Sequence, residues 1–418
     1  MWLTCEIAVR VIAGYGLPTD FYGSEPPQPL QDYQTTIGIK TVQGLGWTHL
    51  GWIADPKLEY YLLEICQYGQ WQVISRTEYG SFLYKGLDAR LRVLKVNRHT
   101  ARRSILGEVV IVGKTGEVQA QELQIIGNWK PIFKPSRYGD YINDHSIYLD
   151  KSGTWRLIGI TSHGAGDYNK EKYFSTCKFD GFPPTQEGTE SEPLADFGEL
   201  AWAPQVLVEN NNYHLFWSPH KLHHMVSTDG RYFSNHQVVI ERPYHKYFRD
   251  AYIIKVSENQ YLLYATSRGK YFSRIDIYQS FDLKFWQYIR PALRSTWGSE
   301  RNFVTGSMES PKVMSYKNGY YLSTTYNNGS TFLSALFLEL HLFLDKKSYN
   351  DTLVFFSTNP YDFGIYSSRK SSRSLVSSLQ AHAPNYVQVD DRWYITTSGW
   401  PFAATLTEGE VALAELSW

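Results

Sequence analysis

Three carboxylates in the C-terminal two thirds of the chain each stand at the start of a strand-like segment. They are Asp144 in Asn-Asp-His, Asp250 in Arg-Asp-Ala and Glu309 in Glu-Ser-Pro. Carboxyl groups that converge from separate segments can share acid–base work: one protonates a departing oxygen, and another activates water or attacks carbon. A third carboxyl nearby raises the pKa of the acid by like-charge repulsion. These are the groups that hydrolysis of a glycosidic bond requires.

The segments that carry these carboxylates belong to a fivefold internal repeat. Each copy has a polar or proline-containing start, an apolar strand, a polar turn and an aromatic-rich strand, and the copies are marked by His145, Pro204, Ala251, Pro311 and Pro384. Four strands in roughly 50 residues, five times over, predict a five-bladed β-propeller. We expect it to span residues 131–418, with the three carboxylates at equivalent inner-strand starts near its centre.

A second repeated element follows three of the hairpins, at residues 227–233, 280–286 and 357–363. Each begins with serine, contains an acidic or amide turn residue and ends on an aromatic ring. We interpret these elements as structural, because such a turn reverses an outer strand and the ring fills the gap between sheets.

Residues 1–130 do not join the repeat. Apolar pieces of strand length alternate there with turns at Gly69, Gly80 and Gly113, which predicts an antiparallel β-sandwich. A glycan-binding role and a purely structural role both stay open for this domain. Residues 131–138 are interpreted as the linker.

Composition excludes several classes of function. The 41 basic and 41 acidic residues give no net charge, which argues against a general nucleic-acid binder. Aromatic residues make up 16% of the chain and charged residues 20%, so the chain is expected to be folded. The partner expected is a small-molecule or oligosaccharide substrate, and the oligomeric state is left open.

Targeting signals are weak. Cys5, Cys66 and Cys177 are too few for a disulfide framework, and none forms a CxxC pair. The N-terminus has no clear signal peptide, so a cytoplasmic location is favoured. The longest apolar stretch, residues 332–344, is too short to span a bilayer.

Taken in order, these motifs resemble those of the five-bladed propeller glycoside hydrolases of families 43 and 32. The resemblance is confined to the predicted propeller, and it rests on five elements. These are Asn143-Asp144 (Asn-Asp of family 32), residues 202–206 (Trp-Ala-Pro-x-Val of family 43), residues 248–250 (Arg-Asp-Pro of family 32), residues 309–311 (Glu-Gly-Pro or Glu-Cys-Pro of both) and residues 280–286 (Ser-x-Asp-Leu-x-x-Trp).

The resemblance implies a glycoside hydrolase that acts on a furanoside or pentose. Asp144 would be the general base or nucleophile, Asp250 would modulate pKa and stabilise the transition state, and Glu309 would be the general acid. The sequence departs from the families where His145 and Ala251 replace proline, and where serine replaces Gly or Cys after Glu309.

Further residues are candidates for the same site. Substrate binding is assigned to Asn143, His145, Trp202, Arg249, His163 and Trp400. For Arg249 an ion pair with Asp250 is an equal alternative, and for the aromatic residues packing between blades is another.

One further histidine is a candidate metal ligand. His382 resembles the axial histidine that helps hold a central ion in some family 43 members, although a buried histidine with satisfied hydrogen bonds is the simpler interpretation. No cofactor is expected to be required, and a central calcium or another structural ion is left open. His220, His223 and His224 could bind a metal only if all three turned one way.

Two other functions stay open. The replacements at His145, Ala251 and Ser310 and the apolar residues 332–344 are compatible with a non-hydrolytic enzyme that cyclises or rearranges a hydrophobic metabolite. A catalytically inactive glycan-binding protein is the third hypothesis.

Overall fold

The computed structural model describes residues 38–114, 116–162, 164, 167–194, 197–268, 273–295, 307–327, 350–367, 374–401 and 406–418. Strands dominate the described residues, with one short 3-10 helix at Tyr168–Lys170. None of the helices in this described part is long and apolar enough to cross a membrane. The chain divides into two compact units, Met1–Glu117 and Val118–Trp418.

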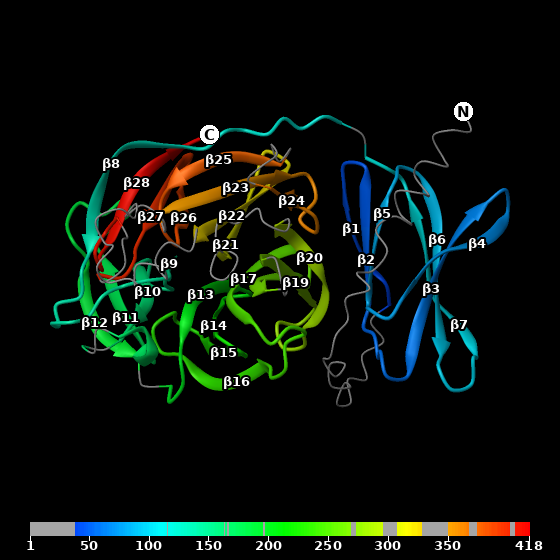
Figure 1. Ribbon diagram of the computed structural model, residues 1–418, viewed down its shortest axis with the longest axis horizontal. Helices are drawn as coiled ribbons and strands as arrows, with labels where there is room; N and C mark the ends of the chain where they lie inside the picture. Colours follow the sequence, from blue (N-terminus) through cyan, green and yellow to red (C-terminus); the bar gives the residue numbers. More distant parts are fainter. Residues whose placement is uncertain are drawn as a thin grey trace, which may run out of the picture. The chain divides into compact units, whose positions relative to one another are not determined.

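The C-terminal unit is a five-bladed β-propeller (Figure 1), as the repeat predicts. Each blade is a four-stranded antiparallel sheet, and β24 (Gly364–Tyr366) adds a parallel strand to the third blade. From the innermost strand outward, the first four blades are β9 (His145–Leu149), β10 (Trp155–Thr161), β11 (Tyr173–Phe179) and β12 (Thr189–Leu194); β13 (Trp202–Glu209), β14 (Asn212–Ser218), β15 (Leu222–Ser227) and β16 (Ser234–Ile240); β17 (Phe248–Ser257), β18 (Gln260–Arg268), β19 (Ser273–Ser280) and β20 (Gln287–Ser295); and β21 (Ser307–Tyr316), β22 (Gly319–Asn327), β23 (Asp351–Ser357) and β25 (Leu375–Gln380).

The fifth blade closes the ring by joining the two ends of the propeller. It consists of β26 (Asn385–Val389), β27 (Arg392–Thr397), β28 (Val411–Ser417) and β8 (Gln124–Phe133), which pairs with β28 as the outermost strand. The predicted domain boundary between residues 130 and 131 therefore falls inside a propeller strand, and the structure places the division after Glu117 instead. The hairpin repeat could not reveal β8, because this strand pairs with the far end of the chain.

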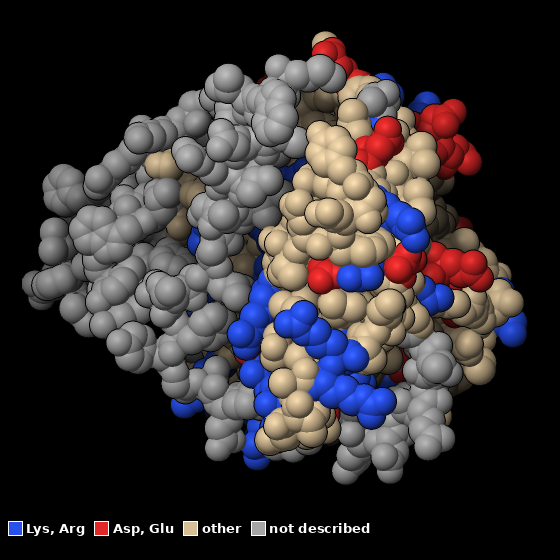
Figure 2. Space-filling model, turned by 90° about the vertical axis from the view of Figure 1, so that its right-hand side faces the viewer, with Lys and Arg blue, Asp and Glu red and all other residues tan. Residues whose placement is uncertain are grey.

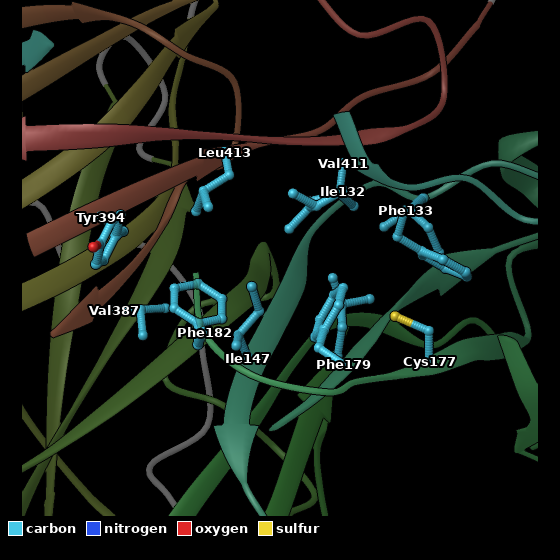
Figure 3. Close-up of a cluster of buried hydrophobic side chains, with 12 residues drawn as sticks. Ile132, Phe133, Ile147, Cys177, Phe179, Phe182, Val387, Tyr394, Val411 and Leu413 are labelled. Atoms are coloured by element: carbon cyan, nitrogen blue, oxygen red, sulfur yellow. The ribbon is translucent and has the colours of Figure 1, made fainter. Parts of the chain in front are cut away.

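A buried apolar cluster packs the first blade against the fifth at this closure (Figure 3). Ile147 and Phe179 of the first blade meet Val387 and Leu413 of the fifth, and Phe182 stacks edge-on against Tyr394 with ring centroids 5.7 Å apart. Burial of such side chains stabilises a fold by about 1.5–3 kcal/mol each. The cluster therefore holds together the blades that carry Asn143-Asp144 and His382.

Bulges interrupt the innermost strands at the same place in three blades. The ladder register shifts between Trp202 and Gln205, between Arg249 and Tyr252, and between Glu309 and Lys312. The residue at each bulge, Ala203, Asp250 and Ser310, has a left-handed backbone with φ of 50°, 55° and 49°. A bulge bends its strand and re-aims side chains, and it often lies beside an active site.

These bulges correct one expectation about the carboxylates. Asp250 is itself the bulge residue of its blade, whereas Glu309 precedes the bulge residue Ser310. The carboxylates therefore do not occupy fully equivalent repeat positions. The local backbone at each position, and not the repeat alone, directs each side chain.

The serine-containing turns have the structure expected of them. Ser280 accepts hydrogen bonds from the backbone N–H groups of Asp282 and Leu283, and its hydroxyl donates to the Asp282 carboxylate. Trp286 ends the turn and packs edge-on against Phe216 of the neighbouring blade, with ring centroids 6.4 Å apart. Part of the aromatic content thus serves blade-to-blade packing.

The N-terminal unit is an antiparallel β-sandwich, as predicted. One sheet has the order β1-β2-β5, and the other has the order β4-β3-β6-β7. The strands are β1 (Lys40–Gly44), β2 (Trp47–Gly51), β3 (Glu59–Gln67), β4 (Gln70–Thr77), β5 (Ser81–Lys85), β6 (Ala89–Asn97) and β7 (Arg103–Ile111). Leu50, Leu63, Leu91 and Val93 form its buried core.

The four-stranded sheet of this unit carries cations on the face turned away from the core. Arg76 lies over the ring of Tyr60, with the guanidinium carbon 4.0 Å from the ring centroid, and Arg92 lies over Trp71 at 4.3 Å. Figure 2 shows one face on which many Lys and Arg side chains are gathered together, with others lying among Asp and Glu side chains.

Candidate active site

Asp250 accepts several hydrogen bonds on one of its carboxylate oxygens. Its Oδ2 atom accepts hydrogen bonds from Arg249 Nη1 (2.6 Å), Thr266 Oγ1 (3.0 Å) and the Ser310 backbone N–H (3.2 Å). Burial raises its pKa to about 6; Arg249 opposes this rise, and Asp144 adds to it. The side chain that β17 presents at its bulge is thus tied to β21 of the next blade.

Arg249 connects Asp250 to Glu309. One guanidinium nitrogen pairs with the Asp250 carboxylate and the other with Glu309 Oε1. Its Nε atom donates to the hydroxyl of Tyr247 at 3.0 Å. A planar guanidinium suits this bridging because its donors point in fixed directions. The ion pair with Asp250, one of the two roles weighed for Arg249, is present, and the substrate-binding role stays a prediction.

Asp144 joins the cluster from the first blade. Burial raises the pKa of Asp144 above its ordinary value, and the charge of Glu309 acts in the same direction. The side chain of Ser310 and the positive charges of Lys312 and Arg249 lie close enough to oppose this rise. Asp144 Oδ1 is buried and meets no hydrogen-bond partner among the described residues. A buried carboxylate oxygen in this position has acceptor capacity for a water or a substrate group.

The charges of the cluster do not balance if every group is ionised. Asp144, Asp250 and Glu309 are 6%, 3% and 4% exposed, and the cations beside them are Arg249 and Lys312. Three carboxyl groups with two cations leave one negative charge uncompensated, which is costly in a buried setting. The cluster therefore favours holding one proton, shared between coupled groups. An acid and a base can coexist in such a site.

A fourth carboxyl group, which the sequence did not single out, lies near Asp144. Glu171 follows the short 3-10 helix, and its Oε1 atom accepts hydrogen bonds from Tyr141 (2.7 Å) and Trp400 (2.8 Å). Burial raises its pKa to about 8, and Asp144 contributes to this rise. Glu171 thus favours its neutral form, and it joins the first blade to the Trp400 segment beyond β27. Only tertiary contact brings these residues together.

Three predicted residues form a buried polar network. His145 is held by the Thr396 hydroxyl (2.7 Å from Nε2) and the Ser398 hydroxyl (3.1 Å from Nδ1), and burial lowers its pKa to about 3. Asn143 Oδ1 lies 3.0 Å from His382 Nε2. His145 therefore hydrogen-bonds the first blade to the fifth, and its predicted contact with substrate stays a prediction.

The two predicted tryptophans lie in different surroundings. Trp400 donates to Glu171, and its ring lies 5.3 Å from that of His382, which places it beside the network at the centre. Trp202 packs against the apolar core between the first two blades, and it also lies close enough to Glu171 to lower the pKa of that carboxyl. His163 lies outside the described residues.

The residues around His382 do not fit a divalent ion. Its Nε2 atom is engaged by the Asn143 amide oxygen, and the described residues contain no group of three His, Cys, Asp or Glu side chains arranged to hold a metal. Lys312, whose charge acts on Asp144 and His145, adds a positive charge that would repel such an ion.

The histidines of the second blade are also not gathered into one metal site. His223 and His224 are consecutive on β15 and therefore point to opposite faces. His223 pairs with His236 (Nδ1 to Nε2, 3.0 Å), and His224 pairs with His214 (2.9 Å). His220 lies in the turn before β15, with φ of 65°.

Comparison with known proteins finds similarity among solved structures only. No protein-family model matches the sequence, and no curated protein does. Similar solved structures include a thermostable family 43 glycoside hydrolase (14% identity, covering 68% of this chain and 91% of that chain, TM-score 0.48) and a family 32 β-fructofuranosidase from Bombyx mori (13%, 69% and 61%, 0.46). Another is an exo-1,5-α-L-arabinanase from a bovine ruminal metagenomic library (12%, 67% and 95%, 0.44). Families 43 and 32 are those that the motifs resemble.

Proposed function

We propose that the propeller hydrolyses a glycosidic bond, with Asp144, Asp250 and Glu309 as its carboxylates. The observation that carries the proposal is the joining of three carboxyl groups from three blades. Arg249 links Asp250 to Glu309, and Ser310 contacts both Asp144 and Asp250. The substrate class proposed, a furanoside or pentose, rests on the motif resemblance.

The proposed division of labour follows from the partners of each carboxyl group. Asp144 has an unpartnered oxygen among the described residues and is assigned as base or nucleophile. Glu309 is assigned as the general acid, which takes up the proton of the cluster when a sugar displaces Arg249 from its carboxyl group. Asp250 keeps three hydrogen bonds on one oxygen and holds the charges of the cluster in place.

The test is turnover of aryl α-L-arabinofuranosides, β-D-xylosides and β-D-fructofuranosides by the wild type, Glu309→Gln and Asp144→Asn. Each variant is expected to lose at least about 100-fold in kcat, the usual contribution of a positioned acid or base. Asp276→Asn is the matched control, because Asp276 is also a buried carboxyl with a pKa raised to about 6, on the third strand of its blade. It should retain turnover if folded.

Two outcomes would reject the proposal. Undiminished turnover in both variants would remove the carboxylates from the chemistry, and lack of turnover on every substrate would reject the hydrolase itself. Sugar affinity that survives Glu309→Gln without any product would favour the inactive glycan-binding alternative.

A further inference from the structure

Lys312 is a buried lysine among the carboxylates and was not singled out by its sequence motif. It lies on β21, just beyond the bulge that contains Ser310, and is 3% exposed. Its Nζ atom stands 4.8 Å from the ring centroid of Tyr252 on the neighbouring innermost strand. Lysine is rarely buried to this degree without a compensating partner. Cation–π attraction to Tyr252 provides part of that compensation.

Two carboxylates provide the rest at longer range. Lys312 makes no direct ion pair with a described residue, yet Asp144 and Asp250 both favour its charged form against the effect of burial, which lowers its pKa. Conversely, its charge lowers the pKa of Asp144 and of the neighbouring His145. The ammonium therefore acts on several groups at the centre of the propeller at once.

Asp250 and Glu309 already have a cation of their own. Arg249 contacts both of them directly, so its single charge is divided between two carboxylates. Asp144 has no such direct partner and retains an unpartnered buried oxygen among the described residues. Lys312 is thus the second cation of the cluster, and Asp144 is the carboxylate that depends on it most.

We propose that Lys312 is a positioning residue whose ammonium favours the ionised form of Asp144 against the effect of burial, so that the chain itself supplies the central positive charge in place of a bound cation. The residues around His382 do not fit a divalent ion, and a second cation beside Lys312 would be repelled. The kinetic consequence of this proposal rests on the proposed hydrolase function, but the effect on Asp144 does not.

The charges that face Asp144 set the sign of the expected change. Lys312 and Arg249 favour its ionised form, whereas Glu309, Asp250 and Glu171 oppose it. The neighbouring histidine, His145, stays neutral because burial lowers its pKa to about 3. His382 lies near His145 and bonds to Asn143. Loss of the Lys312 charge therefore leaves mostly groups that raise the pKa of Asp144.

The primary experiment titrates Asp144 directly. The protein is labelled with 13C at the aspartate carboxyl carbons, and the Asp144 signal is assigned with Asp144→Asn. In Lys312→Met the pKa of Asp144 is expected to rise by about 1 to 3 units, the usual effect of one nearby charge. Lys312→Arg should restore most of the wild-type titration. Lys255→Met is the control, since Lys255 pairs with Glu209 away from the cluster.

The pH profile provides the second measurement. Because a protonated base is inactive, the acidic limb of kcat/KM should move to higher pH in Lys312→Met by the same amount, and Lys312→Arg should move it back. If the wild type has no turnover, the hydrolase proposal fails while the carboxyl titration still decides the role of Lys312. A folded Lys312→Met protein with an unchanged Asp144 titration overturns the proposal.

The replacement of a bound cation is tested on the wild type. Its thermal unfolding midpoint should be the same in EDTA and in millimolar calcium chloride. A calcium-dependent rise of several degrees would overturn this part of the proposal, because a structural ion that binds only the folded state must stabilise it.

Discussion

Two arginine–glutamate pairs, one in each unit, show how strongly the surroundings of a charge decide what it can do. Arg90 pairs with Glu108 on the β-sandwich with side chains 56% and 35% exposed, whereas Arg249 pairs with Glu309 at the propeller centre with side chains 15% and 6% exposed. Water screens the first pair and weakens its attraction. The second pair is coupled to further buried carboxyl groups, whose protonation then depends on the charges around them.

The largest expected effect is the loss of the shared cation. Arg249→Met should lower the free energy of unfolding by about 3–5 kcal/mol at pH 8, because it removes the cation that two buried carboxylates share. Arg90→Met, the matched change in the sandwich, should leave the urea denaturation midpoint unchanged. At pH 5 the loss in Arg249→Met should shrink, since protonated carboxyl groups need no cation. Equal effects of both changes would contradict the comparison.

Glu171→Gln is expected to stabilise the protein. Burial raises the pKa of Glu171 to about 8, so its folded state holds a proton that the unfolded chain releases at neutral pH. The resulting penalty grows from about pH 4.5 to pH 8 and reaches about 3 kcal/mol at pH 7. Glutamine keeps an acceptor for Tyr141 and Trp400 without that penalty. The gain should appear in denaturation at pH 8 and vanish at pH 4; the reverse order would refute the neutral state of Glu171.

The paired histidines of the second blade should make the propeller sensitive to acid. Burial lowers the pKa of His223 to about 4 and of His224 to about 3. The unfolded chain therefore takes up protons first as the pH falls below about 6.5, and stability is lost from there toward pH 4 at about 1.4 kcal/mol per pH unit for each histidine. His224→Gln should reduce the slope of unfolding free energy against pH by the contribution of one histidine.

The exposed His99 of the sandwich is the control for that slope, and His99→Gln should leave it unchanged. Denaturation curves taken between pH 7 and pH 4 provide the measurement. Identical slopes in the wild type and His224→Gln would show that the buried pair is not the source of the acid sensitivity.

The smallest expected effect belongs to the aromatic–arginine contacts of the sandwich. Trp71→Leu removes the ring that Arg92 covers and should cost about 0.5–1 kcal/mol of unfolding free energy, as exposed cation–π contacts do. Lys312 of the propeller makes a comparable cation–π contact with Tyr252, but both side chains belong to the buried interior. A loss at Trp71 as large as that at Arg249 would remove the contrast between the two regions.

Several features of the propeller could be predicted because they repeat locally. The innermost strands begin where the five motif copies begin, and the three carboxylates stand at those starts. The other groups of the site have no such signal. The residues next to Lys312 in the sequence are typical of a strand, and Glu171 follows a short 3-10 helix. A buried lysine could have been suspected only from its place directly after the Glu-Ser-Pro motif.

Hydrogen-bonding partners define the surroundings of the two predicted histidines. His145 and His382 stand at strand starts like the carboxylates, but Thr396, Ser398 and Asn143 come from segments distant in sequence and occupy their ring nitrogens. The domain boundary differs from the predicted one for a similar reason. β8 pairs with β28, which lies at the other end of the propeller sequence. Neither the hydrogen-bond partners of the histidines nor the pairing of β8 with β28 can be recognised from the local sequence pattern.

The sequence by itself determined the all-β class, the fivefold repeat and the three carboxylates, because alternating apolar residues and turn chemistry act over short distances. The tertiary structure alone decided which charges share the centre of the propeller. Closing the ring brings Arg249, Ser310 and Lys312 to those carboxylates from different blades, and their burial removes the water that would screen them. That proximity, and not the residue types alone, sets which carboxyl group can hold a proton.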